Sequence, residues 1–194
     1  MPGALLPPDP KDSDGDGDTS SFYSAQELQV FRLSSKSHWD VPVEVDGEIV
    51  LGLASHPTPP VFDDGTALTY PDAPVADWNG LRNHDEIRFW ADYVTPGRGG
   101  YIYDDEGTYG GLAEGARFVI VGDQNADPLD GDATFNPILM LLDSPLVDTS
   151  VTPASDGALE QVPAGFSERQ TKTASFNLRA DYALPSVAGW DYLR

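Results

Sequence analysis

Short apolar runs divide the chain into a few predicted strands. Residues 39–55 predict a β-hairpin, because Val41, Val43 and Val45 alternate with polar or proline positions, Asp46-Gly47 is typical of a tight turn, and the apolar residues 49–54 form the returning strand. Residues 118–121 are continuously apolar and rich in β-branched side chains, which predicts a buried strand. Residues 174–184 are expected to form one further strand that ends before a proline.

Helical spacing of apolar residues predicts helices over residues 22–33, 83–94 and 135–142. Ser24 is followed three residues later by Glu27, the spacing of a capping box at a helix start. Asn83 and Glu86 have the same spacing and predict the start of the second helix. Long irregular segments are expected over residues 63–79, 96–116 and 143–173.

Residues 1–21 are rich in proline and aspartate and predict a linker ahead of one domain over residues 22–194. The acids from Asp12 to Asp18 resemble the opening of a calcium-binding loop. The twelfth loop position is Tyr23, however, where an EF-hand requires glutamate. A solvated acidic linker is therefore favoured over a calcium site.

Composition narrows the classes of function. The 194 residues are 40% hydrophobic, enough for one domain with a core, and they include no cysteine. The chain has 11 Lys and Arg residues and 32 Asp and Glu residues. The resulting net charge of −21 repels nucleic acid and anionic membranes at long range. We see no apolar run that would span a membrane and no signal peptide at the start of this chain.

Candidate chemistry follows the predicted strand over residues 118–121. Asp123 and Asn125 come directly after its glycine, and three more aspartates follow by residue 132. Strand ends that deliver acids and amides commonly form sites in α/β proteins, although a polar turn fits the spacing equally well. His56 stands at the end of the predicted hairpin, before a run of prolines, and is either held for a function or part of an ordinary loop.

Four longer strings carry a family resemblance: RLSSKSHWDVPV, SHPTPPVFDDG, RNHDEIRFWADYV and GDQNADPLDGD. With LRADYALPS they place His56, Asp123, Asn125 and Asp181 in the order seen in the endonuclease/exonuclease/phosphatase superfamily. The chain is similar to a bacterial branch of secreted phosphatase or nuclease-like proteins. The resemblance implies an α+β or α/β DNase I-like fold, in which two packed sheets lie between outer helices.

The resemblance also implies a metal-dependent hydrolase of phosphodiesters or phosphomonoesters. Asp123 would align or deprotonate the attacking water and contribute weakly to metal binding. Asn125 and His56 would donate hydrogen bonds to the phosphate. Asp181 would orient a second histidine.

Lys36 and His38, on the strand paired with that of His56, are expected to add positive charge for substrate binding, although an exposed strand lysine is an equally good interpretation of Lys36. Mg²⁺ is the expected cofactor, with Mn²⁺ or Ca²⁺ as alternatives. The expected partner is a phosphorylated small molecule or nucleic acid; no membrane and no obligate protein partner is expected. The resemblance suggests an extracellular or periplasmic location.

The chain departs from the family pattern at both ends. In the family, a strand that bears an Asn and a strand that bears a metal-binding Glu precede the GDxN motif. A Ser-Asp-His segment follows the family's Asp-Tyr strand. Nothing before residue 32 can form the two strands, and no histidine follows Asp181, since the three histidines are His38, His56 and His84. We therefore expect an incomplete domain with weak or no activity of its own. The alternative is a non-catalytic acidic module that binds cations or a partner.

Overall fold

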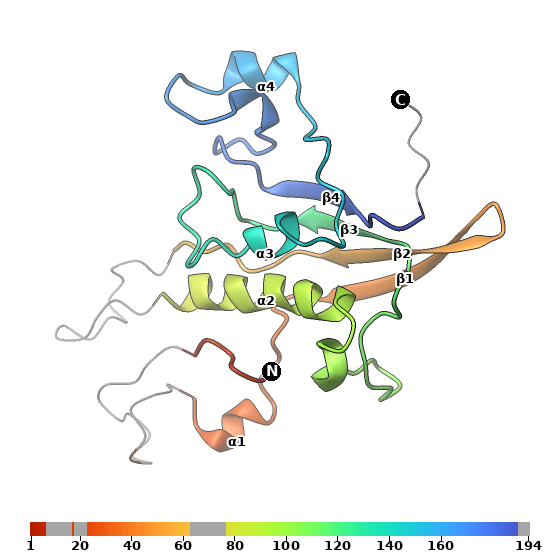
Figure 1. Cartoon of the computed structure of the whole chain (residues 1–194). Helices are drawn as coiled ribbons and strands as arrows, with labels where there is room; N and C mark the ends of the chain where they lie inside the picture. Colours follow the sequence, from red (N-terminus) through yellow and green to blue (C-terminus); the bar gives the residue numbers. More distant parts are fainter. Residues whose placement is uncertain (7–16, 18–22, 63–76, 190–194) are drawn as a thin grey trace.

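The computed structural model describes residues 1–6, 17, 23–62 and 77–189, and these contain one four-stranded sheet (Figure 1). The strands are β1 (His38–Val45), β2 (Glu48–Ser55), β3 (Phe118–Asp123) and β4 (Asp181–Pro185), and they are hydrogen-bonded in that order. β1 and β2 are antiparallel, β2 and β3 are parallel, and β3 and β4 are antiparallel. The result is a mixed α/β structure.

The predicted hairpin is confirmed as β1 and β2. Asp46 and Gly47 connect the strands with φ values of 52° and 81°. Positive φ at both central residues is what a two-residue hairpin turn needs to match the twist of its strands. The predicted strand at 118–121 is also confirmed and runs two residues further, to Asp123.

The helices are α1 (Ala25–Leu28), α2 (Trp78–Val94), α3 (Leu139–Leu142) and α4 (Asp156–Gln161), with 3₁₀ turns at Gly99–Tyr101 and Arg169–Thr171. The capping box of Ser24 and Glu27 is confirmed at α1. The box predicted from Asn83 and Glu86 is wrong, because α2 begins five residues earlier and is capped by Asp77, which accepts from the Gly80 amide at 2.9 Å. Asn83 and Glu86 are instead buried inside α2.

Three predicted elements are shorter than expected. The helix predicted over 22–33 is confirmed only over Ala25–Leu28. The helix predicted over 135–142 begins only at Leu139, because Phe135 and Asn136 have positive φ values of 61° and 48°. The strand predicted over 174–184 begins only at Asp181, since residues ahead of it form a turn in which the Asn177 amide donates to the Ala174 carbonyl. The 143–173 segment, predicted to be irregular, contains α4 and the second 3₁₀ turn.

Residues 1–6, the first part of the predicted linker, lie against α2. The Leu5 amide donates to the Asp85 carboxylate at 2.7 Å, and Arg88 donates to the carbonyls of Pro2 and Gly3, so residues 1–6 contact α2. The acidic stretch from Asp12 to Asp18, including the possible calcium loop, lies outside the described residues apart from Gly17.

The hydrophobic core lies between the sheet and the helices α2 and α3, which cover one of its faces (Figure 1). Alternate strand residues face this side because successive side chains point to opposite faces of a sheet. The fully or almost fully buried members on the strands are Leu53, Phe118, Ile120, Tyr182 and Leu184, and on the helices Ile87, Trp90, Val94 and Leu141.

The opposite face of the sheet remains open. On β1, Trp39, Val41, Val43 and Val45 point to this side and are 62%, 46%, 47% and 51% exposed. The second sheet of the expected sandwich is not found among residues 1–6, 17, 23–62 and 77–189. Sheets with an apolar face bury it against another layer, so this face is where such a layer would pack.

We expect this open face to cause self-association. Replacing both Val41 and Val43 with Thr keeps β-branched side chains but removes apolar surface, and should shift the concentration dependence of sedimentation toward monomer. Glu44→Thr, on the opposite face of the same strand, is the control and should leave association unchanged. A wild-type chain that stays monomeric at high concentration would contradict this expectation.

Candidate active site

The ends of β2 and β3 lie side by side. In their parallel register Ala54 is opposite Val121, so the residues that follow both strands reach the same edge of the sheet. Gly122 has φ 132°, and a Cβ built there would lie 2.0 Å from the Ser55 carbonyl oxygen. Only glycine therefore allows the two backbones to come this close. Just beyond them, His56 Nε2 lies 3.6 Å from Asp123 Oδ2.

The loop after β3 is fixed by Asn125. Its backbone has φ 51°, a left-handed conformation that asparagine tolerates better than most residues. Its backbone amide donates to Asp123 Oδ1 at 2.9 Å, and its side-chain Nδ2 donates to the Pro57 carbonyl at 3.1 Å. Asn125 thereby links the Asp123 carboxylate to the residue that follows His56.

Asp181 is the first residue of β4 and is directly opposite Asp123 in the β3–β4 register. Directly opposite residues place their side chains on the same face. Tyr182, the next residue, points into the core, so Asp181 and Asp123 share the open face. The Asp181 amide donates to Thr173 Oγ1 at 3.0 Å, which fixes the start of the strand.

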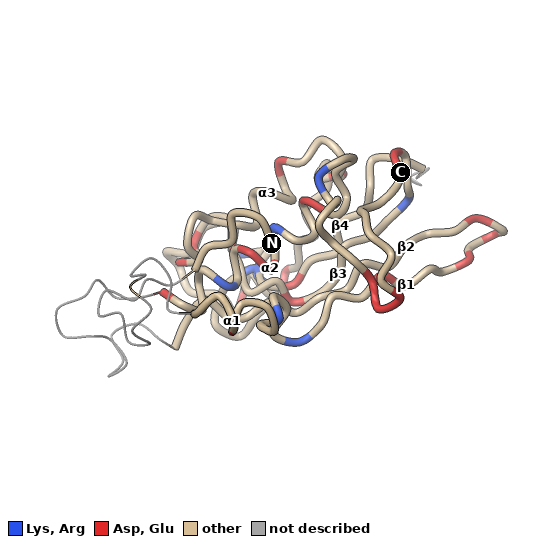
Figure 2. The backbone as a smooth tube through the Cα atoms, turned by 90° about the horizontal axis from the view of Figure 1, so that it is seen from below, with Lys and Arg blue, Asp and Glu red and all other residues tan. Residues whose placement is uncertain are grey.

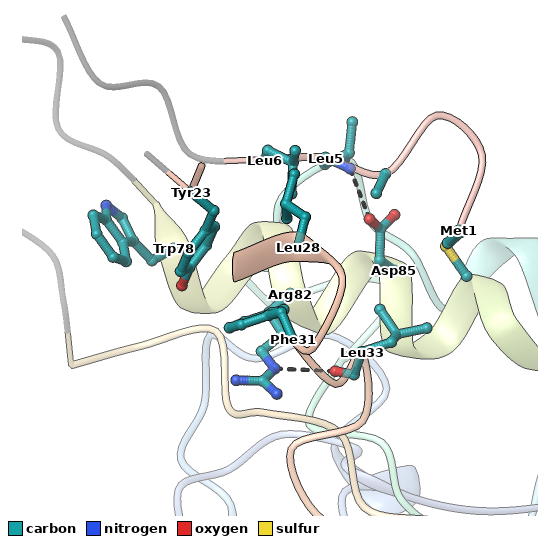
Figure 3. Close-up of a pocket in the computed structure, with 11 residues that line it drawn as sticks. Met1, Leu5, Leu6, Tyr23, Leu28, Phe31, Leu33, Trp78, Arg82 and Asp85 are labelled. Atoms are coloured by element: carbon teal, nitrogen blue, oxygen red, sulfur yellow. Dashed lines mark hydrogen bonds between the residues drawn. The ribbon is translucent and has the colours of Figure 1, made fainter. Parts of the chain in front are cut away.

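The structure thus brings His56, Asp123, Asn125 and Asp181 together at one edge of the sheet. The side chains of His56 and Asp123 are 48% and 31% exposed, so the group is open to a ligand from solvent. Separately, a cavity of about 230 Å³ lies between residues 1–6, α1 and α2 (Figure 3). None of the four candidate residues lines that cavity.

Lys36 and His38 differ in their positions. Lys36 Nζ donates to the His56 carbonyl at 3.2 Å, so its ammonium group lies beside the candidate site. The His38 imidazole instead packs on Phe89 at 4.4 Å between ring centroids, and its Nε2 donates to the Glu86 carbonyl at 2.9 Å. His38 therefore faces α2, and this position gives no support to the substrate-binding role expected for it.

Burial against α2 lowers the pKa of His38 below its ordinary value of 6.5. The unfolded chain therefore binds a proton at a higher pH than the folded chain does. Between pH 6.5 and the folded pKa, the free energy of unfolding should fall as the pH is lowered. Denaturant unfolding of the wild type and His38→Gln over this range checks the effect. An equal pH dependence in both proteins would contradict it.

Sequence reasoning missed a buried ion cluster beside the site. Lys172 Nζ lies 2.7 Å from Asp127 Oδ2 and 2.5 Å from Asp130 Oδ2, and the three side chains are 1%, 0% and 16% exposed. Asp127 Oδ2 also accepts from the Arg179 amide at 2.6 Å. The cluster therefore holds the loop after β3 against the segment that leads into β4. Lys172 stands in a stretch predicted to be irregular, where no local pattern marks it.

All three groups of the cluster are charged at neutral pH. Burial acts to raise the pKa of Asp127, but hydrogen bonds from the Arg179 amide and from Lys172 outweigh it and lower the pKa. The Lys172 ammonium likewise lowers the pKa of Asp130. Burial opposes the charge of Lys172, but hydrogen bonds to the two aspartates raise its pKa. These two aspartates are engaged with Lys172, unlike Asp123 and Asp181 on the open face.

Within the described parts of the chain, no three His, Asp or Glu side chains lie close enough together to hold a metal ion. Asp123 and Asp181 provide two neighbouring carboxylates. Mg²⁺ is commonly held by one or two carboxylates, with waters and substrate phosphate oxygens completing its shell. The pair fits part of such a site.

These features define a mixed α/β protein with an imidazole, an amide and two carboxylates at one edge of its sheet. A family model described as the endonuclease/exonuclease/phosphatase family matches residues 18–193, and the chain belongs to this family. The family includes nucleases and phosphatases, which hydrolyse phosphate esters and typically depend on a divalent cation. No curated protein and no solved structure matches the chain. None of the described helices has the length and apolar character needed to cross a membrane.

Proposed function

We propose that the protein is a metal-dependent phosphoesterase that acts on phosphodiester or phosphomonoester bonds at the edge formed by β2, β3 and β4. The observation that carries this proposal is the accessible group in which His56 lies 3.6 Å from Asp123, with Asp181 directly opposite. Family membership supports hydrolysis as the kind of reaction.

Each side chain has a role that fits its position. Asp123 Oδ1 accepts from the Asn125 amide, which leaves Oδ2, on the His56 side, to align or deprotonate an attacking water. His56 donates a hydrogen bond to a non-bridging phosphate oxygen. One N–H of the Asn125 side-chain amide donates to the Pro57 carbonyl, and the other can donate to the phosphate. Lys36 adds positive charge beside His56.

Asp123 and Asp181 would hold the cation, with Mg²⁺ as the first choice and Mn²⁺ or Ca²⁺ as alternatives. When bound, the cation would polarise the phosphoryl oxygens and offset the charge that develops on them. Asp181 thus contributes a carboxylate in this proposal, besides the orienting role that the family resemblance gives it. Full activity would need further ligands and a layer over the open face, so the 194 residues alone should turn over slowly.

The expected substrate is a small phosphoester rather than duplex DNA. The net charge is −21, and Figure 2 shows acidic residues gathered at the tip of the β1–β2 hairpin. Such a surface opposes the approach of a polyanion, although cations reduce the effect.

A second candidate is a non-catalytic acidic module that binds cations or a partner. The strongly acidic composition, with a net charge of −21, is the observation that favours it. It differs from the first in predicting binding without turnover.

The test is a hydrolysis screen in Mg²⁺ and Mn²⁺ with p-nitrophenyl phosphate, bis(p-nitrophenyl) phosphate and DNA. It should be run on the 194 residues and on the longest natural chain that contains them. Turnover of a small phosphoester by the longer chain supports the proposal. Cation binding with no turnover by either chain would favour the acidic module.

A further inference from the structure

One face of α2 is hydrogen-bonded to three segments of the candidate site. These are the segment before β1, the end of β2 with the loop that follows it, and the loop after β3. Asn83, Glu86 and Trp90 occupy positions i, i+3 and i+7 of α2 and so lie on the same helix face. Asn83 and Glu86 are 0% exposed and Trp90 is 1% exposed. Polar side chains this deeply buried are normally retained for the hydrogen bonds that they make.

Asn83 joins the two loops that carry the site. Its Nδ2 donates to the Thr58 carbonyl at 2.8 Å and to the Gln124 carbonyl at 3.0 Å. Thr58 lies two residues after His56, and Gln124 lies between Asp123 and Asn125. Asn83 Oδ1 has no hydrogen-bond partner within the described residues. The amide therefore acts through its two N–H donors, one on each loop.

Glu86 makes a second bridge, one helical turn further along. Its carboxylate accepts from the Thr58 amide and from the Ser35 amide, each at 2.5 Å. Ser35 precedes Lys36, so Glu86 ties the loop after β2 to the segment that leads into β1. A buried carboxylate that accepts two backbone N–H groups gives short, strong hydrogen bonds with defined geometry.

Trp90 is the third residue on this face of α2. Its Nε1 donates to Ser55 Oγ at 2.8 Å, and Gln124 Nε2 donates to the same oxygen at 3.3 Å. Ser55 directly precedes His56. Each of these side-chain hydrogen bonds from α2 therefore reaches a residue next to, or two positions from, a candidate site residue.

We propose that Asn83 and Glu86 are positioning residues, which set the distance between His56 and Asp123 by holding the loops after β2 and β3 on α2. Neither touches the substrate. Misplacing reacting groups by about 1 Å costs on the order of 100-fold in rate, so loosening these bridges should act on kcat. The kinetic part of this proposal rests on the proposed phosphoesterase function.

The test compares Asn83→Ala and Glu86→Gln with Asp92→Asn. Asn83→Ala removes both N–H bridges, and Glu86→Gln keeps the size of the side chain but replaces one acceptor oxygen with an NH₂ group. Asp92 is a suitable control because it is a buried acid on the same helix, 3% exposed, and it contacts Arg98 at 2.9 Å and Tyr101 at 2.9 Å instead of the site loops.

The first readout does not depend on activity. Amide hydrogen exchange at Thr58 should accelerate by on the order of tenfold in Asn83→Ala and Glu86→Gln, while exchange at Ile120 in the core stays unchanged. Asp92→Asn removes a buried charge that pairs with Arg98, so any acceleration it causes should be of equal size at Thr58 and Ile120. In Asn83→Ala and Glu86→Gln, acceleration of equal size at Thr58 and Ile120 would mean that the residues act on global stability alone and would overturn the proposal.

The second readout is hydrolysis of bis(p-nitrophenyl) phosphate in Mn²⁺ by the longest natural chain that contains these residues. We expect kcat to fall about 10- to 100-fold in both positioning variants, with little change in KM. Wild-type kcat in both variants would overturn the proposal. Absence of turnover in the wild type would count against the proposed function, and the exchange result would still decide the role of α2.

Discussion

Replacing Asp123 with Asn is expected to lower kcat for phosphoester hydrolysis by about 10²- to 10⁴-fold, the usual worth of a positioned acid or base. The variant keeps the shape of the side chain and an oxygen that can accept from the Asn125 backbone amide, as Asp123 Oδ1 does at 2.9 Å in the wild type. It removes the negative charge from the group that faces His56 and lowers the affinity of the site for a cation. Since the side chain is 31% exposed, the free energy of unfolding should change little.

Asp132→Asn is the matched control for this variant. Asp132 lies in the same loop, is exposed, and makes the same change of charge. It should leave kcat close to the wild-type value. If Asp123→Asn kept wild-type kcat, or if both variants lost activity equally, Asp123 would have no specific part in the chemistry.

Replacing Lys172 with Met should lower the free energy of unfolding by about 3–5 kcal/mol, as expected when one partner of a buried ion cluster is removed. Asp127 and Asp130 would then keep their negative charges beside each other without the ammonium that now lies 2.7 Å and 2.5 Å from them. Denaturant unfolding at neutral pH measures the loss.

Lys36→Met, at an exposed lysine, is the control and should cost about 1 kcal/mol or less. The triple variant Lys172→Met with Asp127→Asn and Asp130→Asn should recover part of the loss, because no charge is then buried without a partner. A cost near that of Lys36→Met would show that the cluster is not important for stability.

The pH dependence of this cluster has a definite sign. The pKa values of Asp127 and Asp130 are lowered from 3.8 in the folded chain. Their contribution to stability is therefore complete above pH 3.8 and is lost as the pH falls through the folded pKa values. The difference between the wild type and the triple variant should shrink over the same range.

Local signals in the sequence predicted the parts of the fold that depend on local chemistry. The Asp46-Gly47 turn and the alternating valines before it define the hairpin, and the apolar run of β3 marks a buried strand. The strand predicted at 174–184 was too long because its length depends on its partner. β4 pairs with β3 only from Asp181, and the pattern before it cannot show where that pairing stops.

The candidate site divides in the same way. His56, Asp123, Asn125 and Asp181 were predictable because they follow or begin strands and match a family pattern. The residues that support them were not, because their contacts join distant parts of the chain. Asn83 lies 41 positions from Gln124, and Lys172 lies 45 positions from Asp127. The spacing of Asn83 and Glu86 even suggested a capping box, since an i, i+3 polar pair has the same form on a buried helix face.

The most direct test of the central claim is the metal dependence of phosphoester hydrolysis at this site. The longest natural chain that contains residues 1–194 would be assayed on bis(p-nitrophenyl) phosphate before and after chelation, and again after Mg²⁺ or Mn²⁺ is restored. We predict that excess chelator abolishes turnover, that either cation restores it, and that restoration fails in Asp123→Asn. Full turnover in excess chelator, or equal restoration in Asp123→Asn, would contradict a metal-dependent site built on these residues.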